Sequence, residues 1–179
     1  MNTTASKAIL VSQLSYRNRN AVIGQIVFVI TALSLPLVTH RLGLDYRSAQ
    51  PMHWMIFFAG LTYGPISGMA VGFLVPVLSH IFTGMPGPMM LVLMIPELMC
   101  YGLVAGFLKK RITAFGAMLV ASLSGKAVYL GIACMTAKAS GSLFSAMSNT
   151  WEKSIPAIIV MIVLLPVMSG LYIRVCKRD

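Results

Sequence analysis

The sequence has few charged residues, and acidic ones are the scarcest: 14 Lys and Arg and four Asp and Glu among 179 residues. A soluble domain carries roughly 25% charged residues to cover its surface, whereas this chain has 10%. This shortage, with a mean hydropathy of +0.84, predicts a helical protein that crosses a lipid bilayer several times. In such a chain the net charge of +10 indicates basic residues that flank membrane spans on the cytoplasmic side, rather than nucleic-acid binding.

The sequence also lacks the motifs of the common enzyme classes. The three cysteines form no CxxC pair and no metal-ligand spacing, and no HExxH or GxSxG motif occurs. The stretch "SGKAV" around Lys126 is not a phosphate-binding loop, because no glycine stands five residues before Gly125 and Ala127 replaces the required Ser or Thr. We therefore expect no enzyme activity, no catalytic residue, no metal and no cofactor.

Long apolar runs predict the membrane helices. The first, residues 21–38, is about 27 Å long as a helix, close to the thickness of the hydrocarbon core. The run 53–82 contains "YGP" at 63–65 and is either one kinked helix or two. The remaining runs are 89–108, 112–136 and 155–173. Residues 1–20 hold only a short apolar stretch and are interpreted as a cytoplasmic arm rather than a signal peptide.

Basic clusters decide between five and six helices. They lie in the N-terminal arm, at 109–111 and in the tail 174–179. With a break near Gly64 all three fall on one side of the membrane, and without it the last two fall outside. We therefore predict an all-α, six-helix transmembrane bundle over residues 21–173 with both termini cytoplasmic. The second helix, near 53–62, is about 15 Å long and must pack among its neighbours because it cannot cross alone.

Small residues recur four positions apart in three of the runs. They are Gly60, Gly64, Gly68 and Gly72; Gly102 and Gly106; and Ala117, Ala121 and Gly125. This spacing places them on one helix face, where a neighbouring backbone can approach closely. Packing within the chain is the favoured interpretation, and a docking face for a partner protein is the alternative.

Two charges lie inside predicted spans, Glu97 and Lys126. Each costs about 2.5–3.5 kcal/mol at mid-bilayer, which makes it a candidate functional residue. Tyr101 follows Glu97 by four positions and Tyr129 follows Lys126 by three, so each tyrosine shares a helix face with a charge. A substrate pocket between the two charges and a structural ion pair are both open interpretations.

Further polar and aromatic side chains gather at the outer ends of the predicted helices. We interpret them as the mouth of a pocket that is filled from outside; the alternatives are interfacial anchors for the tryptophans and interfacial polar residues for the histidines. These residues are His53, Trp54, His80, Asn149 and Trp151.

Several segments together resemble the substrate-capture subunits (S components) of energy-coupling factor (ECF) transporters. The resemblance covers roughly residues 20–173 and rests on Pro51 and His53, the glycine series with Pro76, and the motifs "TGMP", "ELMCYGLVAG", "SGKAVYL" and "SIPAIIVMIVLLP". It implies a six-helix bundle in a prokaryotic plasma membrane that binds a vitamin or related micronutrient. It also implies partners, a membrane coupling protein (T component) and two cytoplasmic ATPases.

Within this resemblance, the loops 39–52, 82–89 and 138–152 would close over the ligand. One feature departs from the family: many members carry an AxxxA stretch on the first helix for docking the coupling protein, and here Gln25 stands four positions after Ala21. The docking face therefore stays open.

The leading hypothesis is a high-affinity capture subunit of an ECF-type ABC importer, in which Lys126 binds an anionic group of the substrate. The alternative is an autonomous proton-coupled secondary carrier that uses Glu97. Such carriers usually show paired repeats, and the sequence has no convincing internal duplication. A third hypothesis is a structural membrane subunit with no ligand.

Overall fold

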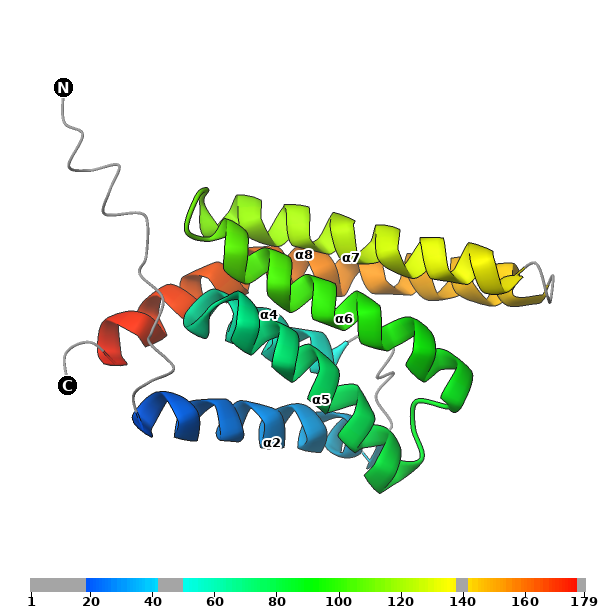
Figure 1. Cartoon of the computed structure of the whole chain (residues 1–179), viewed down its shortest axis with the longest axis horizontal. Coiled ribbons are helices and arrows are strands. Elements are labelled where there is room, and N and C mark those ends of the chain that lie inside the picture. The colour runs from blue at the N-terminus through cyan, green and yellow to red at the C-terminus, as the bar shows by residue number, and fades with distance from the viewer. Residues whose placement is uncertain (1–18, 42–49, 138–141, 177–179) are drawn as a thin grey trace.

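A computed structural model of the chain describes residues 19–41, 50–137 and 142–176, and this part is entirely helical (Figure 1). The predicted six-helix, all-α architecture is confirmed. The helices are α2 (Arg19–Arg41), α4 (Pro51–Tyr63), α5 (Pro65–Thr83), α6 (Pro88–Leu108), α7 (Ala114–Ala137) and α8 (Ser142–Cys176).

The helices lie side by side, so the bundle has two ends (Figure 1). The start of α2, the break between α4 and α5, the turn between α6 and α7 and the end of α8 all lie at one end, on the left of the view. The basic residues 109–111 and Arg174 therefore belong to the same end, as the charge argument requires. We call it the inner end, and the opposite end the outer end.

Four helices of the described part are long and apolar enough to cross a membrane: α5, α6, Ala114–Met135 of α7 and Ile155–Val175 of α8. In α2 the apolar part is shorter, Val22–Ser34. Apolar side chains are exposed along these helices, for example Ile30 and Leu123, as expected for surfaces in contact with lipid.

The break between α4 and α5 lies at Gly64, as predicted. Gly64 has φ 108°, a value that glycine adopts without steric cost, and Pro65 begins α5, where its missing N–H is not needed. The short helix α4 packs against α2, α5, α6 and α8, and Ile56 and Leu61 are fully buried. The expectation that this helix packs among its neighbours is therefore confirmed.

The glycine series brings the backbones of α4, α5 and α6 together. A Cβ atom on Gly60 or on Gly68 would lie 2.5 Å from the backbone oxygen of Gly102. One on Gly72 would lie 2.5 Å from the backbone oxygen of Leu98. Such distances leave no room for a side chain, so these glycines serve packing within the chain, the interpretation favoured from the sequence.

The predicted start of the last helix is wrong. The polar stretch before residue 155 was expected to form a loop over 138–152, but α8 already begins at Ser142 and is 35 residues long. Hydropathy marks where a helix leaves the hydrocarbon core, and a helix continues beyond that point where its backbone hydrogen bonds are kept. Similarly, α2 continues to Arg41 and α4 begins at Pro51, so only part of the predicted loop 39–52 is non-helical or lies outside the described residues.

Candidate functional site

The two charges predicted inside the membrane spans are in direct contact. Lys126 Nζ on α7 lies 2.6 Å from Glu97 Oε1 on α6, and the two side chains are 16% and 3% exposed. In such a poorly solvated place the two charges attract each other strongly. Removing either partner would leave an uncompensated buried charge. The pair therefore joins α6 to α7 at a fixed register.

Tyr101 contacts this ion pair from one turn further along α6. Its hydroxyl donates a hydrogen bond of 2.6 Å to Glu97 Oε1, the same oxygen that contacts Lys126. The Tyr101 ring is buried and packs closely against Gly125 of α7, where a Cβ atom would collide with the ring. Gly125 is thus required for the ring position, which adds a reason for the small residue seen in the sequence.

Tyr129 lies on the other side of the lysine. Lys126 Nζ is 5.5 Å from the centre of the Tyr129 ring and 6.0 Å from that of Tyr101, which is within cation–π range. The Tyr129 hydroxyl donates to Met90 Sδ at 3.9 Å. The expectation that each tyrosine shares a face with a charge is confirmed, and we call Glu97, Tyr101, Lys126 and Tyr129 the ionic cluster.

His53 reaches this cluster from the first turn of α4. Its ring centroid lies 5.6 Å from that of Tyr101, and Phe57, one turn later, lies 4.9 Å from the same ring. His53 is only 8% exposed, and both its ring nitrogens lack a hydrogen-bond partner within the described part of the chain.

Gln50 was not among the residues selected from the sequence. It precedes α4, is 8% exposed, and its side-chain oxygen is also buried without a partner among the described residues. Its backbone has φ 45°, in the left-handed region that non-glycine residues seldom adopt. The only signal in the sequence is a polar residue directly before the helix start "PMH", which by itself indicates nothing about burial.

The other predicted mouth residues are placed differently. His80 donates from Nδ1 to the backbone oxygen of Pro86 at 2.7 Å, and Ser79 donates to the backbone oxygen of Met85 at 2.8 Å. These bonds hold the turn between α5 and α6, so the described contacts of His80 are with this turn rather than with the ionic cluster. Trp54 is half-buried against the core.

Asn149 and Trp151 lie on the first part of α8, and their side chains fall outside the described residues. Their predicted role at the mouth of a pocket therefore stays a prediction.

At the inner end, one member of the basic triplet is not a surface residue. Lys109 is 2% exposed and its Nζ donates to Ser169 Oγ of α8 at 3.2 Å, whereas Lys110 and Arg111 are exposed. Burial lowers the pKa of Lys109 to about 8. This lysine ties the end of α6 to α8, which the sequence pattern did not indicate.

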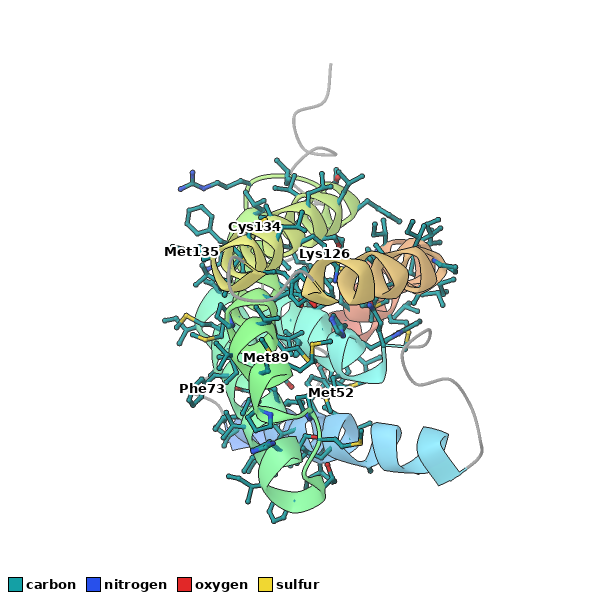
Figure 2. The ribbon with its side chains drawn as sticks, turned by 90° about the vertical axis from the view of Figure 1, so that its right-hand side faces the viewer. Met52, Phe73, Met89, Lys126, Cys134 and Met135 are labelled. Carbon is teal, nitrogen blue, oxygen red and sulfur yellow. The ribbon has the colours of Figure 1, made fainter. Side chains whose placement is uncertain are left out.

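The arrangement suits binding of a polar ligand better than chemistry. It offers an ammonium, a carboxylate, two phenols and a buried imidazole, and no three metal-ligating side chains gather anywhere in residues whose placement is described. In the view onto the outer end, Lys126 lies near the middle of the bundle, whereas Phe73 and Met135 lie at its edge (Figure 2).

The comparison with known families agrees with the fold. The family model described as "ECF transporter, substrate-specific component" matches residues 19–170, which covers all six helices except the last residues of α8. Neither a curated protein nor a solved structure matches the chain. The chain therefore belongs to the family of substrate-specific components of ECF transporters, which are multi-pass membrane subunits of a transporter and not enzymes.

Proposed function

We propose that this subunit captures a vitamin or related micronutrient carrying an anionic group from outside, and that partner ATPases drive its uptake. The observation that carries the proposal is the ionic cluster, because ionisable residues inside a membrane bundle are costly and usually mark a binding site or a transport pathway. The family supports the partners: a membrane coupling protein and two cytoplasmic ATPases.

The difference in exposure within the pair supports an anionic substrate. Lys126 is the more accessible partner, at 16%, and Glu97 lies behind it at 3%. A carboxylate or phosphate that approaches Lys126 would share the ammonium with Glu97 and would lie near the rings of Tyr101 and Tyr129, which flank the ammonium. An ammonium has three N–H donors, so it can hold more than one acceptor.

The proposal includes an orientation in the prokaryotic plasma membrane. Residues 1–20 form a cytoplasmic arm, 21–173 the membrane domain and 174–179 a cytoplasmic tail. The support is that α2 begins and α8 ends at the inner end, beside the basic residues 109–111. The structure describes only residues 19–20 of the arm and 174–176 of the tail.

The test is binding by the purified chain in lipid nanodiscs, followed by native mass spectrometry, with pantothenate, biotin, nicotinate and lipoate as anionic probes and thiamine as a cationic one. We expect an anionic probe to bind without ATP and the Lys126→Met variant to lose it, while Lys110→Met, at an exposed inner-end lysine, keeps it. Binding by Lys126→Met at wild-type strength contradicts the role of the cluster.

Uptake into vesicles separates this function from the alternatives. We expect accumulation of the bound probe only when the coupling protein, both ATPases and ATP are present. Accumulation by the chain alone under a proton gradient would instead show a secondary carrier that uses Glu97. Binding of none of the probes, with no accumulation under a proton gradient, would favour a structural subunit.

A further inference from the structure

Three buried side-chain atoms in the described part of the chain have no hydrogen-bond partner, and they belong to two residues that stand three positions apart. They are Gln50 Oε1 and both ring nitrogens of His53. Both side chains are more than nine-tenths buried, so water does not replace the missing partners freely. Buried polar groups are almost always paired, because an unpaired one loses its hydration without compensation.

The backbone holds both side chains in positions where these polar atoms have no hydrogen-bond partner. The His53 N–H donates to the Gln50 backbone oxygen at 3.0 Å, which fixes Gln50 directly before α4 and His53 in its first turn. Gln50 adopts φ 45° although it is not a glycine, and backbone strain of this kind is found mostly at functional sites.

His53 lies beside the ionic cluster, and Gln50 stands three residues before it in the chain. The His53 ring is 5.6 Å from the Tyr101 ring, and Lys126 Nζ is 6.0 Å from the same ring. Since α4 ends at Gly64 at the inner end and is 13 residues long, its start lies about 20 Å from that end, in the outer half of a bilayer core of about 30 Å. The unpaired atoms are therefore at the depth where a substrate from outside would arrive.

We propose that Gln50 and His53 form a neutral hydrogen-bonding subsite, and that the substrate is an anion whose body also carries amide, ureide or hydroxyl groups. The Gln50 oxygen accepts from an N–H or O–H of the ligand. In its neutral form, the imidazole of His53 offers one donor and one acceptor. The anionic group meets Lys126, whose Nζ also lies close to the Tyr101 ring. This inference rests on the proposed function, because it describes the substrate of the same site.

The first test needs no ligand. In the apo protein, Gln50→Met and His53→Leu remove unpaired polar atoms with little change in volume, so we expect the midpoint of thermal unfolding in nanodiscs to stay unchanged or to rise by about 2–4 °C. The matched control is Gln25→Met. Gln25 Oε1 accepts from Ser67 Oγ at 2.7 Å, so this change leaves a serine unpaired and lowers the midpoint. A fall for Gln50→Met as large as that for Gln25→Met overturns the proposal.

The second test uses probes that differ in their neutral groups. Biotin and lipoate both carry a carboxylate on a similar chain, but only biotin has a ureide ring; pantothenate has an amide and hydroxyls, and octanoate has neither. We expect the wild type to bind biotin or pantothenate at least about 10-fold more tightly than lipoate and octanoate, and each variant to lose this preference.

The outcomes separate the subsite from the function on which it rests. Equal binding of lipoate or octanoate, or a preference retained in both variants, overturns the subsite and leaves anion capture intact. Binding of none of the four probes by the wild type overturns the subsite, and anion capture falls with it when nicotinate does not bind either.

Discussion

Breaking the ion pair between Glu97 and Lys126 should cost a different amount of stability depending on which partner is replaced. The variant Lys126→Met leaves the Glu97 carboxylate, which is 3% exposed, with the Tyr101 hydroxyl as its remaining donor in the cluster. The variant Glu97→Gln leaves an ammonium that is 16% exposed and therefore in partial contact with solvent or headgroups. The stranded carboxylate is the more costly of the two, because it is the more completely removed from water.

Magnitudes follow from the burial of each group. Removing one partner of a buried pair costs about 3–5 kcal/mol, and we place Glu97→Gln near the lower and Lys126→Met near the upper value. For a chain of 150–250 residues each kcal/mol corresponds to about 2–4 °C in the unfolding midpoint, so we expect falls of roughly 6–20 °C. The double variant Glu97→Gln with Lys126→Met removes both charges and should cost less than Lys126→Met alone.

The measurement is thermal unfolding in nanodiscs for both single variants and the double variant, with Lys110→Met as a control on the exposed surface. If the stability cost of the double variant equals the sum of the two single costs, the reasoning is refuted, because additive costs indicate residues that do not interact. The double variant also addresses the two interpretations of the pair. Stable folding with lost binding of the anionic probe indicates a binding role, and stable folding with binding retained indicates a structural role alone.

Three further predictions concern single residues. Gly102→Ala should destabilise by about 1–3 kcal/mol, because its Cβ atom would collide with the backbone of Gly68, while Gly131→Ala, with open space around it, should stabilise slightly; unfolding midpoints decide this. Burial lowers the pKa of Lys109 from 10.5 to about 8, so the unfolded chain binds the proton more tightly, and stability should rise between pH 8 and 10.5. The midpoint of thermal unfolding should rise across this pH range in the wild type and should not rise in Lys109→Met. Tyr101→Phe should cost about 1.5–3 kcal/mol, through its hydrogen bond to a carboxylate, and weaken binding of the anionic probe; an unchanged midpoint would argue against that bond.

Much of the fold was predictable because its signals are local. Apolar runs with few charges locate the helices, and the pair Gly64–Pro65 marks a helix end followed by a helix start, whatever surrounds it. Spacing along one helix also placed Tyr101 beside Glu97, because residues four apart lie on one face. The polarity of the segment before residue 155 misled the prediction, since a helix outside the hydrocarbon core needs no apolar sequence.

The six helices, the break at Gly64 and the two intramembrane charges, each with a tyrosine on the same helix face, could be predicted from the chain alone. Four findings needed the packed structure: Glu97 and Lys126 touch, His80 holds a turn, Lys109 is buried beneath α8, and the Gln50 side-chain oxygen has no partner among the described residues. The reason is physical: helical period and hydropathy are properties of neighbouring residues in the chain. Burial and hydrogen-bond satisfaction depend instead on which side chains of other helices arrive at the same place.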